Sequence, residues 1–457
     1  MKVFLTLLIL NVAIHLAAQR QDSLNHLSIK MALSIAEANY PSLKSKRYEA
    51  EAAQKNIDLG KNTLTPSLDV SYQANLATAN NITGMFYPGE VIPMTGPVLP
   101  GNNYSPAIGS AAALLFNWQP FTFGQRNSQI NTSKAELVVK SADLENEIFK
   151  QKVNTISAYL DVLLAVSVVS VYQENIERTL FNVHQSRVLA NSGLRPGVDT
   201  ALFLSELSKA RIDLLNTRKN LQSAKINLSK WLVIDSTFTL SDSFLLTRAP
   251  LHAISAIQNS ITQHPSVRFH EAELEFSKSK ETLIKRNWLP KLNVWATGFM
   301  RGSGVYPDGT IKAEDGFSFS KYNYGLGLQL AFPILKFSET RIQEEQQILL
   351  SKSSEALLEQ TSLDLIKQRD IANVTMQNAL DMAKETPVQW QASDYAFRAL
   401  QIRYNAGLVN FADLIQAQYN LVRAETDLKR SYWDSWKALL YKSAVIGDLN
   451  IFLNELK

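Results

Sequence analysis

The chain has 457 residues, of which 46% are hydrophobic and 19% charged, and its 46 Lys and Arg residues exceed its 42 Asp and Glu residues by a formal net charge of +4. Acidic and basic residues are interleaved, so no basic patch indicates a nucleic-acid partner. Cysteine is absent, which excludes disulfides, thiol catalysis and lipid attachment at an N-terminal cysteine.

The first residues have the pattern of a secretory signal peptide. Lys2 precedes an apolar run from Val3 to Ile14, and the small residues Ala17 and Ala18 precede a polar stretch. We expect residues 1–19 to be removed. An uncleaved membrane anchor is the alternative, but the apolar run is short for a helix that spans a bilayer.

The rest of the chain consists of two sequence repeats, residues 20–250 and 251–457. Tyr40-Pro41-Ser42-Leu43 returns as His264-Pro265-Ser266-Val267, Thr65-Pro66-Ser67-Leu68-Asp69-Val70 returns as Leu289-Pro290-Lys291-Leu292-Asn293-Val294, and Asn191-Ser192-Gly193-Leu194 with Asp199 returns as Asn405-Ala406-Gly407-Leu408 with Asp413. Each repeat reads as a short helix, two strands joined by a loop, and two long helices. Such a unit accounts for both a membrane-crossing part and a long soluble part.

Four strands are expected, at about 66–76 and 110–120 in the first repeat and 290–301 and 321–333 in the second. Residues 68–76 alternate apolar and polar side chains, and residues 322–332 do so with aromatic residues near both ends. This alternation is typical of a transmembrane β-barrel wall, although a half-buried strand of a soluble sandwich shows it too. Four strands do not close a barrel, so we expect the barrel to be shared between chains. The loops at 77–108 and 302–320 are expected outside the cell.

Four long helices are expected, at about 123–192, 197–232, 335–406 and 410–446. No Gly or Pro lies between Gly124 and Gly193, whereas Pro387 interrupts the third helix and predicts a kink or local break there. Leucines recur every seven residues in the second helix, with small residues between them, which predicts a coiled-coil seam (Leu207, Leu214, Leu221 and Leu228). The apolar stretch 158–171 is interpreted as packed helix rather than as a membrane span. An isolated helical bundle fits the same periodicity.

The sequence of the second turn and of the helix that follows it resembles that of a known family. Arg403-Tyr404-Asn405-Ala406-Gly407-Leu408, followed by Asp413-Leu414 and Ala417-Gln418, together with the doubled strand–loop–strand, resembles the TolC family of outer-membrane efflux proteins over about residues 27–447. The resemblance implies a mainly α fold with transmembrane β structure. It implies a homotrimer in outer-membrane lipid whose shared 12-stranded β-barrel, four strands per chain, continues into a periplasmic α-helical barrel.

The same resemblance implies a passive exit duct without a cofactor, opened by a periplasmic adaptor and an inner-membrane pump. The turns at Gly193 and Leu194 and at Gly407 and Leu408 are then expected to dock the adaptor. No triad, paired carboxylate or phosphate loop favours an enzyme. A periplasmic coiled-coil adaptor or structural protein is the alternative, but it predicts one helical hairpin with small β-domains.

The resemblance also assigns a gate at the inner tips. Tyr404 falls on the family's gate tyrosine, Asp413 on a pore aspartate, and Asp199 on the aspartate that holds the gate shut through the tyrosine. For both aspartates, helix N-capping is the alternative.

Two positions near the gate depart from the family pattern. Val409 replaces an arginine of some members, and Gln416 replaces a second pore aspartate. Arg195, at the equivalent place in the first repeat, is the candidate for the missing cation.

Overall fold

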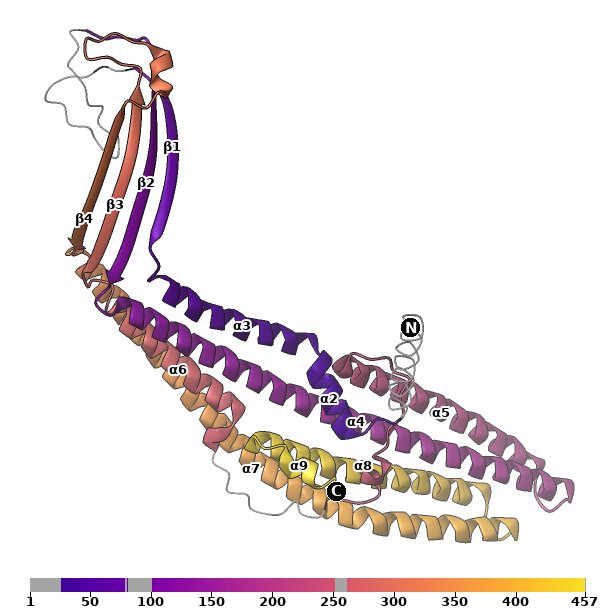
Figure 1. Ribbon diagram of the computed structural model, residues 1–457. Helices are drawn as coiled ribbons and strands as arrows, with labels where there is room; N and C mark the ends of the chain where they lie inside the picture. Colours follow the sequence, from indigo (N-terminus) through magenta and orange to yellow (C-terminus); the bar gives the residue numbers. More distant parts are fainter. Residues whose placement is uncertain (1–25, 79, 81–100, 251–260, 457) are drawn as a thin grey trace, which may run out of the picture. The chain divides into compact units, whose positions relative to one another are not determined.

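The structure is a computed structural model that describes residues 26–78, 80, 101–250 and 261–456. The expected signal peptide and most of the long loop at 77–108 lie outside these residues. The chain forms two compact units, and the long helices α4 and α7 run through both (Figure 1). Unit 1 comprises Met1–Ala50, Val138–Leu274 and Ser354–Lys457, and unit 2 comprises Glu51–Leu137 and Glu275–Ser353.

The elements follow in the order of the doubled sequence. The first half forms α2 (Ile29–Asn39), α3 (Pro41–Asn62), β1 (Ser67–Ala77), β2 (Ala107–Phe121), α4 (Gln125–Asn191), α5 (Gly197–Leu232) and η1 (Ser243–Leu246). The second half forms η2 (Ile261–Gln263), α6 (Pro265–Ile284), β3 (Lys291–Ser303), η3 (Ala313–Phe317), β4 (Lys321–Ala331), α7 (Lys336–Asn405), α8 (Phe411–Ile446) and α9 (Asn450–Asn454). Pro41 and Pro265 each occupy the first position of a helix, where a missing N–H costs nothing. The fold is mainly α with one small sheet, as the sequence predicts.

Unit 2 contains a four-stranded antiparallel sheet in the order β1-β2-β3-β4. One face carries the apolar residues of the alternating strands, and these side chains are exposed, as Val70 (79%) and Leu328 (75%) illustrate. Exposed aromatic residues lie toward both ends of the strands (Tyr72, Tyr322 and Tyr324 at one end, Phe121 and Phe332 at the other). An apolar band between two sets of aromatic residues is typical of the outer surface of a transmembrane barrel.

The other face of the sheet is mainly polar, but it also carries a large ring from β3. Trp295 of β3 pairs with Gly327 of β4. A Cβ on Gly327 would lie 2.8 Å from the indole, and one on Gly325 would lie 3.3 Å from it. The glycines of β4 therefore make room for a large ring on the polar face, and the alternation of β3 is preserved.

The segment between β3 and β4 is structured rather than a simple loop. Val305 and Ile311 form an isolated bridge, and η3 follows. Ser110 of β2 donates a hydrogen bond from its hydroxyl to the carbonyl of Gly316 at 2.6 Å. Gly316 is buried against the backbone of Ile108, where a Cβ would lie 2.1 Å from the carbonyl oxygen, so only glycine fits. The segment thereby covers one end of β2.

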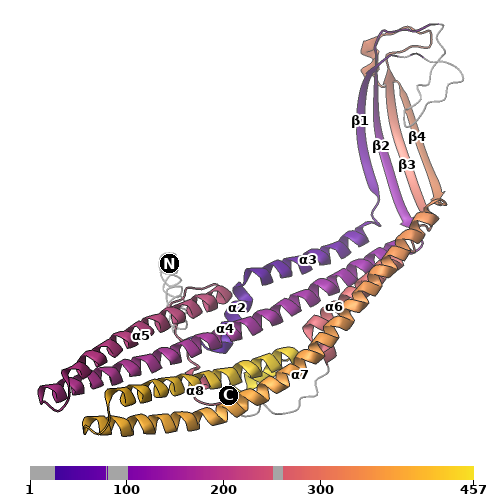
Figure 2. The ribbon, with the colours of Figure 1, turned by 180° about the vertical axis from the view of Figure 1, so that it is seen from behind.

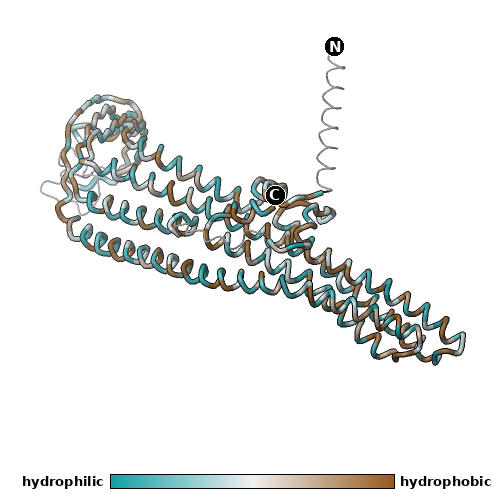
Figure 3. Tube along the Cα trace, turned by 90° about the horizontal axis from the view of Figure 1, so that it is seen from below, coloured by the Kyte–Doolittle hydropathy of each residue, from teal (hydrophilic) through white to brown (hydrophobic). Residues whose placement is uncertain are grey.

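Unit 1 contains most of two helical hairpins, α4–α5 and α7–α8, that lie side by side (Figures 1 and 2). Hydrophobic and hydrophilic residues are mixed along these helices (Figure 3). The predicted seam of α5 is buried at Leu207, Leu214 and Leu228. Of the kink or local break expected at Pro387, the break does not occur, because α7 continues as one helix through this residue. Packing of the surrounding helix outweighs the loss of one backbone hydrogen bond.

The largest core cluster of unit 1 joins α2, the middle of α4 and the ends of α5 and α8. By length and composition alone α4 contains a stretch apolar enough to cross a membrane, but 44% of that window is buried inside the protein. Tyr159 of this stretch is fully buried and donates from its hydroxyl to the carbonyl of Leu27 at 2.7 Å. Asp161 pairs with Lys437 of α8 at 2.8 Å. The stretch is therefore core helix, in agreement with the sequence prediction.

Candidate functional site

The turns that join the paired long helices have the same backbone hydrogen bonds. In the first, Leu194 N–H donates to Leu189 and Gly193 N–H to Ala190, both at 3.0 Å. In the second, Leu408 N–H donates to Arg403 at 2.8 Å and Gly407 N–H to Tyr404 at 3.0 Å. Both are Schellman motifs, which need a left-handed residue, and Gly193 and Gly407 supply it with φ of 69° and 77°.

Each turn presents one leucine to solvent. Leu194 is 71% exposed and Leu408 is 70% exposed. In a Schellman motif a hydrophobic residue at this position commonly packs back onto the last helical turn. Here the two side chains remain largely exposed instead of being buried by such packing.

The gate pair of the sequence analysis is in contact. The Tyr404 hydroxyl donates to Oδ2 of Asp199 at 2.8 Å. Tyr404 is 1% exposed and Asp199 is 8% exposed, and the ring of Phe203 packs edge-on against Tyr404. Burial and the carboxylate of Asp199 raise the pKa of Tyr404 well above its ordinary value, so the hydroxyl remains protonated and remains a donor. The contact joins the end of α7 to the start of α5.

Arg195 crosses from the first turn to the second. Its guanidinium donates to the carbonyl of Tyr404 at 3.2 Å and to the carbonyl of Val409, and it lies 4.6 Å from the centre of the Tyr404 ring. The structure thus places a cation from the first repeat at the turn where Val409 replaces arginine. Carbonyls at the end of α7, which carry partial negative charge, are the groups that a cation stabilises.

Asp413 and Gln416 are not part of this contact. Both are exposed on α8 and line a groove with Ser393 and Ala396 of α7. Gln416 donates from its side-chain amide to Asn420 at 3.1 Å.

Neither gate aspartate is an N-cap. Asn410 caps α8 by accepting from the N–H of Asp413 at 2.9 Å, and Pro196 precedes α5 without a side-chain cap. Asp199 and Asp413 each occupy the third position of their helix. The capping alternative therefore does not explain either carboxylate, although both interact favourably with the helix dipole.

A buried polar network above the tips was missed from the sequence. The side-chain amide of Gln418 donates to Asn175 at 2.8 Å and to Thr179 at 2.7 Å, and Asn182 donates to Gln418 at 3.1 Å. Gln401 of α7 completes the network by donating to Asn182 at 3.1 Å. The three α4 residues are spaced four and three apart, so they share one face, and this spacing was the available signal.

An ion pair adjoins this network. Arg178 of α4 donates to both carboxylate oxygens of Glu425 of α8, at 2.7 and 2.6 Å. Burial outweighs the arginine and raises the pKa of Glu425 above its ordinary value. A buried bidentate pair is strongly directional, so the pair fixes the register of α4 against α8.

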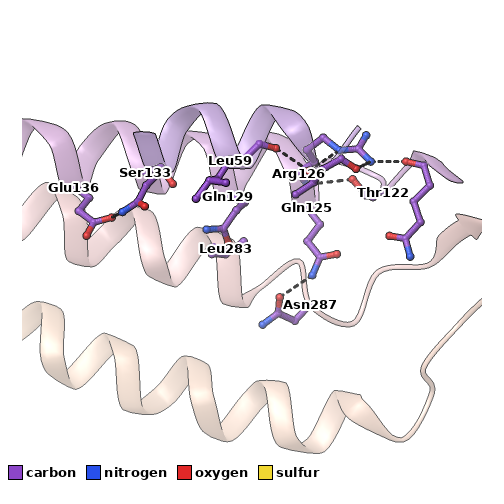
Figure 4. A pocket seen from close by; sticks show the side chains of 13 residues that line it. Leu59, Thr122, Gln125, Arg126, Gln129, Ser133, Glu136, Leu283 and Asn287 are labelled. Atoms are coloured by element: carbon purple, nitrogen blue, oxygen red, sulfur yellow. Dashed lines mark hydrogen bonds between the residues drawn. The ribbon is translucent and has the colours of Figure 1, made fainter. Parts of the chain in front are cut away.

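A polar cavity of about 550 Å³ lies in unit 2 where the strands meet the helices (Figure 4). Arg126 lines it and donates to Thr63 Oγ1 at 3.1 Å and to the Pro120 carbonyl at 3.2 Å. Gln125 donates from its amide to Asn287 at 3.0 Å. These side chains pair with groups at the edge of the cavity, and the hydrogen bonds of Arg126 join the end of α3 to β2 and α4.

Among the residues that the structure describes, no group of three or more His, Asp or Glu side chains is placed to hold a metal ion. The comparisons with known proteins then give one family. The family described as "Outer membrane efflux protein" matches residues 32–232 and 256–438. No curated protein matches the chain.

Several solved structures share the fold. CusC, described as forming a transmembrane channel, is 12% identical with a TM-score of 0.73, and the match covers 92% of each chain. The CmeC outer membrane channel of Campylobacter jejuni is 15% identical with a TM-score of 0.70 over 92% of this chain and 85% of that one. The outer membrane protein VceC of Vibrio cholerae is 13% identical with a TM-score of 0.69 over 92% and 96%.

Proposed function

Because this chain belongs to the outer membrane efflux protein family and is an outer-membrane channel rather than an enzyme, we propose that it is the passive exit duct of a tripartite efflux or type I secretion system. Its barrel lies in the outer membrane and its helical hairpins extend through the periplasm. A periplasmic adaptor and an inner-membrane pump open it from the inner end. The periplasmic-adaptor alternative is set aside because the chain carries two helical hairpins and a sheet with an exposed apolar face.

The observation that carries the proposal is the sheet. In the part of the chain that the structure describes, nothing pairs with the outer edges of β1 and β4. Each unpaired backbone group in lipid costs several kcal/mol, so a membrane-spanning sheet must close on itself. Three copies supply twelve strands, in which β1 of one protomer pairs with β4 of the next.

The dimensions of the strands support the same placement. The 11 residues of β1 reach about 36 Å at about 3.3 Å per residue. A strand of that length tilted by about 45° crosses about 25 Å, the height of the apolar band of outer-membrane barrels. The polar face then lines a wet lumen.

The turns at the inner tips form the gate of this duct and its binding surface for the adaptor. Tyr404, Asp199 and Arg195 hold α7 against α5, and three copies of Asp413 with Gln416 surround the axis nearby. The adaptor covers Leu194 and Leu408, since exposed apolar side chains mark interaction surfaces.

Leu194→Asp combined with Leu408→Asp tests the dock. We expect trimers and membrane insertion to remain, because both side chains are exposed, while crosslinking to the adaptor and efflux are lost. Leu204→Asp, at a residue of α5 that is 45% exposed and lies away from the turn, is the control. Normal efflux in the double variant would refute docking at the tips.

A further inference from the structure

Charge is distributed unequally between the two faces of the sheet. The four strands contain four charged residues, Asp69, Lys291, Arg301 and Lys321. All four lie on the polar face, because each alternates with the apolar residues of its strand. Asp69 and Lys291 lie near the end of the sheet that joins the helices, whereas Arg301 and Lys321 lie at the opposite end.

Arg301 and Lys321 are direct partners across β3 and β4. Both are exposed, and within the described residues neither has a carboxylate partner. The Arg301 guanidinium lies 5.4 Å from the centre of the Phe299 ring, which holds it along the strand without neutralising it. Like charges directly opposite each other destabilise a sheet, so this pair is unfavourable for folding alone.

Among the residues that the structure describes, the surroundings leave the two cations open. Register partners on the polar face of β2 are small residues, with Ala111 opposite Arg301 and Ala113 opposite Phe299. The nearby segment between β3 and β4 contains carboxylates, but Asp315 accepts from the Tyr306 hydroxyl at 2.6 Å and Asp308 from the N–H of Thr310 at 3.0 Å. Glu314 is exposed and pairs with neither cation.

We propose that Arg301 and Lys321 form an anion-binding site on the lumen wall near the outer end of the barrel, which attracts phosphate-type or carboxylate groups of the material leaving the duct. The inference rests on the proposed duct, because the polar face lines a lumen only in a closed barrel. Three protomers place six cations around one level of the exit. Cations in such a ring concentrate permeating anions and repel cations.

The test is block of single-channel current by inorganic pyrophosphate in planar bilayers, with pyrophosphate added to each compartment in turn. We expect pyrophosphate to reach half-maximal block of the unaltered channel when it is added to one compartment, but not when it is added to the other. Arg301→Gln combined with Lys321→Gln should raise the concentration needed by about tenfold. Raising the salt concentration should reduce the difference, since exposed charges are screened.

Lys291→Gln is the matched control, because it removes a cation from the same face at the other end of the sheet. It should leave block near that of the unaltered channel. Equal block of the unaltered channel and the double variant would overturn the anion site while leaving the duct intact. Failure of every preparation to form channels would overturn the duct and the anion site with it.

Discussion

At the scale of single residues, the hydroxyl of Tyr404 is the most tightly constrained polar group at the tips. It is buried, it donates to a carboxylate, and Arg195 lies against its ring. A hydrogen bond to a charged acceptor contributes about 1.5–3 kcal/mol, which corresponds to a ten- to hundredfold change in a two-state ratio. In the gate that we propose, one contact of this kind per protomer would be enough to favour the closed state.

Tyr404→Phe combined with Asp199→Ala should therefore raise the single-channel conductance in planar bilayers. Removing both groups avoids leaving a buried carboxylate without a donor. Tyr419→Phe is the control, because its hydroxyl interacts with Lys209 and Glu206 on the exposed surface. Unchanged conductance in the double variant would place the constriction elsewhere.

A second residue-scale feature is His264, which caps α6. Its Nδ1 accepts from the N–H of Ser266 at 3.1 Å, so the ring proton is on Nε2 and is donated to the carbonyl of Ala444 at 3.1 Å. Burial lowers the pKa of His264 below its ordinary value of 6.5. Protonation of Nδ1 would abolish the cap and place a charge in the core.

Thermal stability should consequently fall in acid. The folded protein binds this proton less readily than the unfolded chain, so stability is full above about pH 6.5 and declines as the pH falls, by up to about 1.4 kcal/mol per pH unit. His264→Asn should be less stable at pH 7.5 but should lose this component of the pH dependence. Melting curves between pH 7.5 and 5 check it, and an equal slope in protein and variant would contradict the cap.

At the scale of elements, the two sequence repeats form two Schellman turns with the same backbone conformation. Cβ atoms on Gly193 and Gly407 would meet nothing within 4 Å, so only the backbone conformation restricts these positions. The turns were readable from the sequence because glycine is the residue that tolerates positive φ.

Gly193→Ala and Gly407→Ala should each lower the free energy of unfolding by about 1 kcal/mol. Gly197→Ala is the control, because that glycine also has open space around it but has no positive φ and begins α5. It should be neutral or stabilising. A loss of stability at Gly197 equal to that at Gly407 would mean that backbone conformation is not what the turns require.

The sequence predicted other elements only in part. The alternation in β1 and β4 predicted their faces, but Trp295 obscured that of β3, because a ring accommodated by two glycines of a neighbouring strand is visible only in the register. The extent of α7 was predicted, but the local break considered at Pro387 does not occur, since a proline signal is local while helix packing is not. The contact of Tyr404 with Asp199 came from the family resemblance. The Gln418 network joins three helices that are distant in sequence, so the spacing of its three α4 residues was not enough to predict it.

At the scale of the whole molecule, the chain has features that make sense only in an assembly. Its sheet has two free edges in the described residues, and the apolar side chains of β1 and β4 are exposed. In the duct that we propose, lipid covers the apolar face and neighbouring protomers satisfy the edges. Each chain would then be one third of a barrel, and its stability would be inseparable from trimer formation.

Disulfide crosslinking of β1 to β4 of the next protomer tests this account most directly. The chain has no native cysteine, so every disulfide formed comes from the introduced residues. Cysteine at Val70 would be combined in turn with cysteine at Tyr324, Leu326 or Leu328, and oxidised in outer-membrane fractions. Val70→Cys with Leu114→Cys is the control, because these residues are partners within one chain. We predict that at least one β1–β4 combination yields covalent trimers while the control yields monomers. Monomers alone from all three combinations, with the control disulfide formed, would contradict the shared barrel.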